Sequence, residues 1–488
     1  MYRMRSENLY KKLSASFQNF ERISLITANH EVVYLKYHTL ADIGTLQQSA
    51  EVAHNYLQLQ DGDIVITNDP YSGGTLLSSP TLVLGIGTKT SKGVTPAEFL
   101  ISSRMTFLPR VGPFNNLDEE GLRIPPSPFY IKGDLNSPIV EALKNHPLAK
   151  EDFINRIIRE AEKLLSLRAN LKNQLQEQKL DLSRNTIKEY LNTTTERFLK
   201  RLEDVGEGST SIDYEISESE LIRLKLEHHD GIFNFDFSGS SPGHRMFLTD
   251  TATFGVAVGA TLSLLQENIP INSGVLSRFD IKAPRGSLLN STFPRSIYLG
   301  HTDGLNLLAN LILKAFYKIN KKQTWALSGP SHCSYELVFR DGRVFYDALP
   351  TGVGATENSK GLSGVFAWRK NWQPSSIEQW EAQFPIEVLQ AGFRSNSGGD
   401  GKNSGGEGVS RSLLLLEDAE LRWNYLSPPH QPDGIEGGKS ALGPEMIVKH
   451  AKSEEPIKLS QHGKLSLSKG DIFSVLTAGG GGHGSTNQ

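Results

Sequence analysis

Residues 61–74, DGDIVITNDPYSGG, join a short apolar run to a polar turn. The run Ile64-Val65-Ile66 predicts a buried strand. The chain then passes through Asn68 and Asp69 into a proline and the paired glycines Gly73-Gly74, which favour a sharp turn. Polar loops at strand ends are frequent positions for binding or catalytic groups, so Asn68 and Asp69 are candidate site residues.

The segments around this strand indicate an N-terminal α/β module over residues 1–149. Apolar runs at 23–26 and 32–35 predict two further strands. Residues 46–57 favour a helix because their apolar side chains recur at helical spacing.

Two helices are predicted to divide this module from the rest of the chain. Apolar residues recur with helical periodicity over 151–176 and again from Ile187 to Leu202. We therefore expect a helical hairpin over residues 150–205.

Beyond Gly206 the pattern changes to short strands and apolar helices, which predicts a β-rich module over 206–488. Thr302 and Asp303 are expected to cap a helix that follows them. The expected elements are strands at 212–216, 221–226, 232–237 and 275–281, and buried helices at 251–266 and 305–317. The predicted fold class is mixed α/β (α+β), in several parts, because single cores stop growing near about 250–300 residues.

The composition excludes several classes of partner. The chain has 488 residues, 22% of them charged, and a formal net charge of -3, which gives no electrostatic case for nucleic acid or an anionic membrane. The longest uncharged segment, 251–266, is shorter than the ~20 residues a membrane span requires. Cys333 is the only cysteine, so no internal disulfide forms, and we expect a cytoplasmic protein.

Local motifs for metals and nucleotides are weak. His228-His229-Asp230 and His332-Cys333 are adjacent residues, which point to opposite faces of a strand, and a surface turn is the better interpretation of the first. Residues 434–440, GIEGGKS, end like a phosphate-binding loop but place Asp433 where the first glycine belongs. We expect no ATP site in this segment.

Glycine-rich loops at 397–408 and 479–484 leave two interpretations open. Their backbones can present several N–H groups to an anion. They can equally form plain turns or close crossings of the backbone, which composition favours.

Five carboxylates are candidates for acid, base or binding roles. Each can also be a helix cap or a solvated charge. Glu378 and Glu381 share a face only if 376–384 is helical. The candidates are Asp69, Glu120, Asp236, Glu378 and Glu381.

Several of these segments, in the same order along nearly the whole chain, resemble the hydantoinase B/oxoprolinase family. Each motif is weak alone, but the collinear set is difficult to obtain by chance. The matching segments are GDIVITNDPYSGGT (62–75), EGLRIPP (120–126), DFSGSSP (236–242), NSG (272–274), APRGSLLN (283–290), GGK (437–439) and TAGGGGHG (477–484).

The resemblance implies a B-type subunit that works with a hydantoinase A-type, ATP-binding subunit in a hetero-oligomer. In such systems the partner, with ATP and Mg, phosphorylates the oxygen of a cyclic amide such as 5-oxoproline, hydantoin or a lactam. Phosphorylation turns a poor electrophile into one that water can attack. The resemblance suggests Asp69 and Glu120 as catalytic residues, and Asn68, Arg123, Asp236, Glu378 and Glu381 as substrate-binding or interface residues.

The sequence departs from the family where the resemblance places metal ligands. Leu76 and Ser79 stand in place of histidine and aspartate, and Thr106 in place of another histidine. A looser alignment puts the remaining acidic ligand at Phe20, beside Glu21. These side chains are poor or impossible ligands, so we expect that this chain binds no metal or other cofactor. Two hypotheses follow: a metal-free subunit that still assists hydrolysis, or a structural or regulatory subunit that has lost the chemistry.

Overall fold

A computed structural model describes residues 2–89, 93–149, 151–202, 205–265, 267–321, 325–368, 376–430, 432–453 and 455–486. Its N-terminal part contains a sheet of seven strands in the order β2-β1-β5-β4-β3-β6-β7, with every neighbouring pair antiparallel. The strands are β1 (Ile23–Thr27), β2 (Val32–Lys36), β3 (Ile64–Thr67), β4 (Thr81–Ile86), β5 (Phe99–Arg104), β6 (Ser127–Ile131) and β7 (Asp134–Leu135). The strands predicted at 23–26, 32–35 and 64–66 are confirmed.

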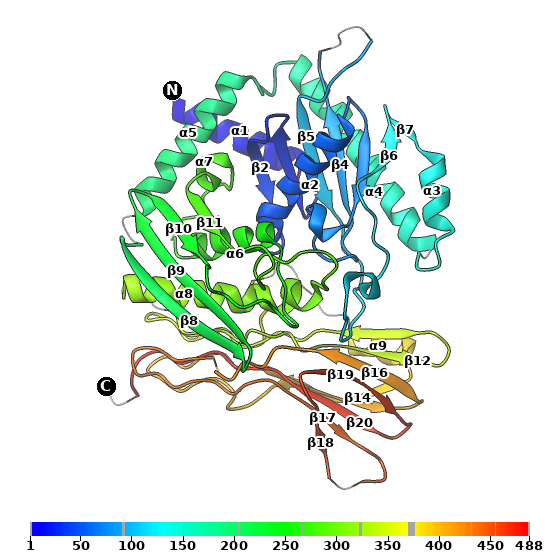
Figure 1. Ribbon diagram of the computed structural model, residues 1–488, viewed down its shortest axis with the longest axis vertical. Coiled ribbons are helices and arrows are strands. Elements are labelled where there is room, and N and C mark those ends of the chain that lie inside the picture. Colours follow the sequence, from blue (N-terminus) through cyan, green and yellow to red (C-terminus); the bar gives the residue numbers. More distant parts are fainter. Residues whose placement is uncertain are drawn as a thin grey trace.

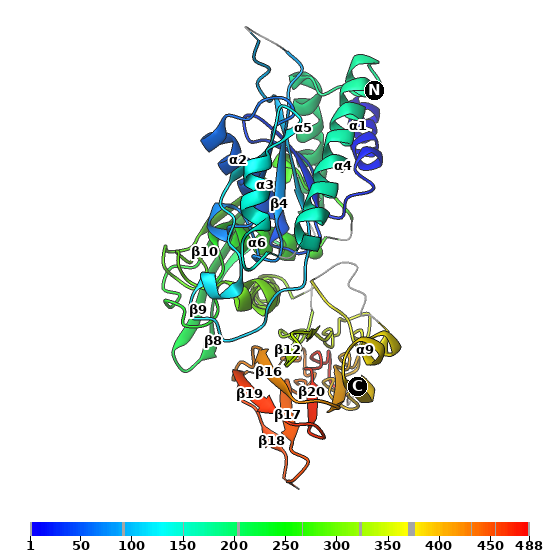
Figure 2. The same ribbon diagram turned by 90° about the vertical axis from the view of Figure 1, so that its right-hand side faces the viewer.

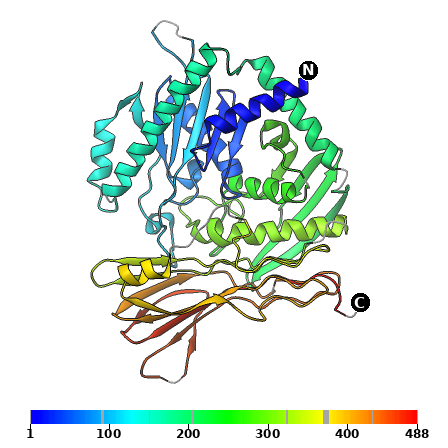
Figure 3. The same ribbon diagram turned by 180° about the vertical axis from the view of Figure 1, so that it is seen from behind.

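Helices cover both faces of this sheet (Figures 1 and 3). Val65 and Val83 face α2 (Asp42–Leu57), whereas their neighbours Ile64 and Leu82 face the opposite core, as alternation along a strand requires. That second core contains α1 (Tyr2–Ser16), α4 (Glu151–Gln176) and the first half of α5 (Arg184–Arg201). The predicted helices at 46–57 and 151–176 are confirmed. A short helix, α3 (Ser137–Lys144), follows β7.

The middle of the chain adds a four-stranded sheet, in the order β11-β10-β9-β8, around two buried helices. Gly44 on α2 lies so close to α6 that a Cβ there would be 2.3 Å from the carbonyl oxygen of Thr251. The elements are β8 (Gly208–Ser217), β9 (Glu220–His229), β10 (Ile232–Asp236), α6 (Asp250–Ser263), α7 (Ser273–Leu276), β11 (Phe279–Lys282) and α8 (Leu305–Ile319).

Two predictions in this region are wrong. Residues 275–281 are not one strand, because the Asn272 side chain caps the short helix α7 before β11 begins. Asp303 does not cap α8, because the helix continues from the π turn η4 (Gly300–Gly304) and has no separate N-terminus there. Asp303 instead accepts hydrogen bonds from His332 N and Leu426 N. The helix predicted at 251–266 is confirmed as α6, although Gln266 lies outside the described residues.

The predicted hairpin turn at His228-His229-Asp230 is confirmed only for Asp230, because His228 and His229 are paired residues at the end of β9. Asp230 and Gly231 have φ of 50° and 70°, and they join β9 to β10. His228 is buried and stacks on Phe233, whereas His229 is exposed, so the two imidazoles do not converge.

The C-terminal part is a sandwich of two antiparallel sheets (Figure 2). Their inner faces share one apolar core that includes Tyr335, Phe345 and Phe473. One sheet has the order β13-β12-β16-β19 and the other β14-β15-β20-β17-β18. The elements are β12 (Ser334–Phe339), β13 (Val344–Asp347), α9 (Ile377–Gln383), β14 (Ile386–Phe393), β15 (Val409–Leu415), β16 (Ala419–Asn424), β17 (Glu445–Lys449), β18 (Ile457–Lys458), β19 (His462–Leu467) and β20 (Ile472–Leu476). The predicted mixed α/β class is confirmed.

Glycine-rich segments beside the sandwich pack backbone against backbone. The amides of Gly399 and Gly405 donate to Gly480 O and Gly399 O, and Gly480 N donates to Gly406 O, all at 2.9 Å. A Cβ on Gly405 would lie 1.8 Å from Gly480 O. We call this cluster the glycine stack; it comprises Gly352, Gly354, Gly398, Gly399, Gly405, Gly406 and Gly479–Gly482. The close-crossing interpretation of these loops is therefore confirmed.

Candidate functional site

Asn68 holds together three segments at the end of β3. It is fully buried. Its amide nitrogen donates to the carbonyl oxygens of Leu77 at 2.7 Å and Leu122 at 2.8 Å. Its amide oxygen accepts from Ile124 N at 2.6 Å. With all these groups bonded to backbone, Asn68 fixes the course of the loop that follows it.

Asp69 and Arg123 lie together beside Asn68. The Asp69 carboxylate accepts from Tyr71 N at 3.1 Å and caps the 3-10 turn η1 (Pro70–Ser72). Arg123 approaches the same carboxylate at 3.8 Å and lies over the Phe293 ring. The three predicted residues thus form one cluster, and their contacts stabilise the loop.

Glu120 ends the 3-10 turn η2 (Leu117–Glu120) and is buried. One carboxylate oxygen accepts from Ser296 Oγ at 2.6 Å, Ile297 N at 2.7 Å and Tyr298 N at 3.0 Å. Burial raises the pKa of Glu120 to about 7, although the three hydrogen bonds act in the opposite direction. The Glu120 carboxyl group therefore accepts backbone N–H groups at the N-terminal end of the helical segment 298–304.

The other three predicted residues lie elsewhere. Asp236 ends β10 and pairs with Lys282 at 3.1 Å. Residues 377–383 form α9, so the condition under which Glu378 and Glu381 share a helical face is met. Glu378 is exposed, and Glu381 accepts from Val388 N at 2.8 Å. The predicted residues therefore belong to at least three separate places and form no single site.

A cavity of about 400 Å³ lies where the resemblance places the metal. Leu76, Ser79 and Thr106 line it, whereas Phe20 is buried in the core behind α1 and its neighbour Glu21 lines the cavity. The loop held by Asn68 carries Leu76 and Ser79, so the polar turn positions one wall of the cavity.

The residues at these positions do not fit a metal ion. Leu76 has no donor atom, and neutral hydroxyls such as those of Ser79 and Thr106 are weak ligands. Within the described ranges, no three His, Cys, Asp or Glu side chains are grouped closely enough to hold a metal. That this chain carries no metal stays a prediction.

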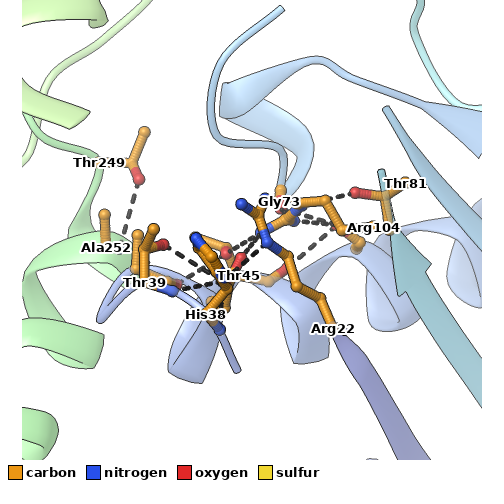
Figure 4. A network of polar contacts seen from close by, with 12 residues as sticks. Arg22, His38, Thr39, Thr45, Gly73, Thr81, Arg104, Thr249 and Ala252 are labelled. Atoms are coloured by element: carbon orange, nitrogen blue, oxygen red, sulfur yellow. Dashed lines mark hydrogen bonds and ion pairs between the residues drawn. The ribbon is translucent and has the colours of Figure 1, made fainter. Parts of the chain in front are cut away.

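A buried network of charges lies beside the cavity (Figure 4). We call it the charge network; it comprises Arg22, Asp42, Arg104 and their partners. Arg104 and Asp42 form an ion pair at 2.8 Å, with both side chains 0% exposed. Arg22 lies 3.6 Å from the same carboxylate. The second amino group of Arg104 donates to Gly73 O at 2.8 Å, which ties the polar turn to β5.

These cations control the ionisation of Asp42. Burial raises its pKa, but Arg22, Arg104 and the backbone amides of Thr39 and His38 outweigh it and lower the pKa to about 2. Asp42 is therefore an anion at neutral pH and compensates one of the two guanidiniums.

His301 forms another wall of the cavity. It is 3% exposed, and neither ring nitrogen has a hydrogen-bond partner among the described residues. Burial, with a smaller contribution from Arg104, lowers its pKa to about 3, so the ring is neutral.

No pattern in the sequence indicated Arg22, Asp42 or His301 as site residues. Asp42 has the local pattern of an ordinary acidic residue in a first helical turn. Arg104 offered a signal, since a charge closes the otherwise uncharged and buried strand β5. No local pattern connects these residues, because they meet only through the packing of α2, β1, β5 and η4.

The segment 434–440 is part of the close-packed backbone around the glycine stack. Gly438 N donates to Ile435 O, and Lys439 N donates to Asp400 O. The Lys439 ammonium pairs with Asp400 at 3.1 Å. In a phosphate-binding loop, backbone amides and the lysine ammonium bind the phosphate. Here the amides of Gly438 and Lys439 and the Lys439 ammonium bind oxygens of this chain.

This architecture defines the class of fold: an α/β part with helices on both faces of its sheet, a four-stranded sheet with buried helices, and a β-sandwich flanked by the glycine stack. A likeness in fold extends to the ATP-dependent caprolactamase from Pseudomonas jessenii, with a TM-score of 0.82 and 18% identity over 99% of this chain and 90% of that chain. In sequence, the family model for hydantoinase B/oxoprolinase matches residues 18–486. The chain belongs to the hydantoinase B/oxoprolinase family.

Two relatives show how much of a longer protein this chain spans. An uncharacterised protein of Methanocaldococcus jannaschii is 27% identical over 95% of this chain and 84% of that protein. 5-Oxoprolinase 1 of Arabidopsis thaliana is 25% identical over 98% of this chain but only 40% of its own length.

Among the described residues, no helix combines the length and the apolar character needed to cross a membrane.

Proposed function

We propose that this chain is the B-type subunit of an ATP-dependent system that opens a cyclic amide such as 5-oxoproline, hydantoin or a lactam. The observation that carries the proposal is the family match over residues 18–486. The chemistry requires an activated amide, because the unactivated carbonyl is a poor electrophile. An A-type partner that binds ATP and Mg supplies that activation in the proposal.

The segment 434–440 supports ATP binding by a partner, because its amides are directed to neighbouring carbonyls rather than to a nucleotide site. The match covers 40% of the length of the Arabidopsis 5-oxoprolinase. In the proposal, ATP binds to a separate subunit, in a hetero-oligomer in the cytoplasm.

The second candidate function is a structural or regulatory subunit without chemistry. Leu76, Ser79 and Thr106 on the cavity wall favour it, because they remove the side chains that would position water through a metal. The catalytic roles of Asp69 and Glu120 stay predictions, and the contacts of both residues are those of groups that hold the loop and a helix start.

The test is to treat this chain with a chelator, remove the chelator, combine the chain with its A-type partner, and measure ATP-dependent opening of 5-oxoproline, hydantoin and caprolactam with Mg²⁺ as the only added metal. Turnover that requires both subunits and is unchanged by this treatment supports a metal-free catalytic subunit. If the two subunits form a stable complex that hydrolyses neither ATP nor the amide, the result supports a structural or regulatory subunit. The absence of any complex contradicts both.

A further inference from the structure

Three side chains that line the cavity beside the charge network carry buried polar atoms without partners. Nε of Arg22, Oγ of Ser78 and both ring nitrogens of His301 lack a hydrogen-bond partner among the described residues, and all three side chains line this cavity. Native proteins leave few buried polar groups unpaired. Their gathering around one cavity indicates a polar ligand.

Two guanidinium groups give the cavity its charge. Arg22 is 8% exposed and shares the Asp42 carboxylate with Arg104. Arg156, from α4, donates one hydrogen bond to Thr106 O and lies over the Phe107 ring at 4.2 Å. A guanidinium has five N–H donors, so both groups retain donors for a ligand.

The remaining lining residues add hydroxyls and one acid. Thr39, Ser79 and Thr302 contribute hydroxyl groups, and Glu21 is the acidic side chain of the lining, exposed at the surface. The neutral His301 ring can donate or accept a hydrogen bond without adding charge. The volume of about 400 Å³ is within the range of small-molecule sites, about 300–1,000 Å³.

We infer that this cavity binds a small oxyanion, a carboxylate or phosphate group held between Arg22 and Arg156, at the place where the family resemblance puts a metal. Arginine suits this role because its planar fork matches a carboxylate or phosphate. The site then selects ligands that carry such a group over uncharged lactams. The choice of 5-oxoproline as a probe rests on the proposed function; the oxyanion site itself rests on the cavity.

The experiment is isothermal titration of the purified full chain, without ATP or partner, using three probes. 5-Oxoproline carries a carboxylate on the lactam ring, and 2-pyrrolidinone is the same ring without it. Inorganic phosphate is the third probe. We expect 5-oxoproline or phosphate to bind at least tenfold more tightly than 2-pyrrolidinone. Competition between the two anions then shows whether carboxylate or phosphate is the preferred group.

Variants locate the binding. Arg156→Met should weaken the anion about tenfold or more, because it removes a charge-assisted contact. Arg159→Met is the matched control, since it removes the same charge from the same helix at a side chain that is 61% exposed and outside the cavity lining. Arg22→Lys should also weaken binding while keeping a cation beside Asp42. Glu21→Gln should tighten it by removing a negative charge.

Several outcomes overturn the inference. Equal binding of 5-oxoproline and 2-pyrrolidinone, or no binding of either anion, excludes an oxyanion site. Stoichiometric Zn²⁺ binding that is lost in Glu21→Gln shows a metal site instead. Because neither ATP nor the A-type partner is present in the titration, these results do not test the proposed function. Failure of ATP-dependent turnover likewise leaves the titration result unchanged.

Discussion

The charge network and the glycine stack are both buried, but they constrain the chain in opposite ways. In the charge network, side chains from α2, β5 and Arg22, the residue before β1, meet through ionic contacts such as the 2.8 Å pair of Arg104 and Asp42. In the glycine stack, backbones meet directly, and a Cβ on Gly405 would lie 1.8 Å from Gly480 O. Two contacting side chains can be replaced by another compatible pair of residues. A contact between two backbones cannot be compensated in this way, because substitution does not change the main-chain atoms that make it.

The largest effect is expected from Gly405→Ala. The added methyl would overlap a carbonyl that is itself fixed by its neighbours, so the segments must separate. We expect a loss of about 4 kcal/mol or more, or failure to fold. Thermal unfolding and the yield of folded protein measure it.

Gly392→Ala is the matched control for that substitution. Gly392 lies in β14, has no positive φ, and a Cβ there meets nothing within 4 Å. We expect a change within about 0.5 kcal/mol. If Gly405→Ala unfolds at the same temperature as Gly392→Ala, backbone contact is not what limits the glycine stack.

Arg104→Met should break the charge network at a cost of about 3–5 kcal/mol, because it leaves the buried Asp42 carboxylate with Arg22, at the longer distance, as its one cation in the network. The double variant Asp42→Asn/Arg104→Met should recover at least about 1 kcal/mol, since it removes the fully buried anion and keeps an acceptor oxygen for the Thr39 and His38 amides. Chemical unfolding followed by circular dichroism measures both. Arg159→Met, on the exposed face of α4, should change stability by less than about 0.5 kcal/mol. A double variant less stable than Arg104→Met would contradict this account.

The same contrast explains what the sequence could predict of the fold. Periodicity and short apolar runs located α4 and the strands β1, β2, β3, β8, β9 and β10, and a long uncharged segment located α6, because these patterns are local properties. They failed at α7, where the Asn272 side chain caps one helical turn ahead of β11. They failed again at Asp303, whose partners His332 and Leu426 are distant in sequence.

For the site, the sequence identified the side of the cavity that the polar turn forms. It did not identify the buried charges and the histidine on the other sides. The polar turn was recognised as one of the collinear motifs, and positions 76, 79 and 106 as places where the sequence departs from the family's metal ligands. Asn68, Asp69 and Arg123 do lie together, although their contacts stabilise a loop. Arg22, Asp42 and His301 were missed because they come from separate elements and share no spacing. The glycine stack was visible in composition because backbone contact demands one residue type.

A fall in pH should weaken the charge network and leave the glycine stack unaffected. The folded pKa of Asp42, about 2, is below its ordinary value of 3.8. A depressed carboxyl pKa adds stability that is complete above the unfolded pKa and is lost as pH falls from about 4 through 2. The contribution is about 2 kcal/mol. Melting temperatures of the wild type and Asp42→Asn between about pH 6 and pH 3 should therefore converge in acid. Parallel curves would contradict the role given to Asp42.

The smallest effect is expected from Glu120→Gln, which separates a helix-capping role from catalysis. Glutamine keeps the oxygen that accepts from Ile297 N and Tyr298 N, so stability at about pH 5, where the buried carboxyl of the wild type is protonated, should change by less than about 1 kcal/mol. Because burial raises the pKa of Glu120 to about 7, ionisation costs the folded state stability as pH rises. The variant should therefore gain on the wild type from about pH 5 to about pH 8.

Glu120→Ala is the companion variant, and it should lose about 1–3 kcal/mol because the backbone donors lose their acceptor. If Glu120 is a capping residue, turnover with the A-type partner survives in Glu120→Gln and falls in Glu120→Ala only as far as folded protein is lost. If turnover disappears in a stable Glu120→Gln, the carboxyl takes part in the chemistry. That result would move the reacting centre away from the cavity, since Glu120 is not among its lining residues.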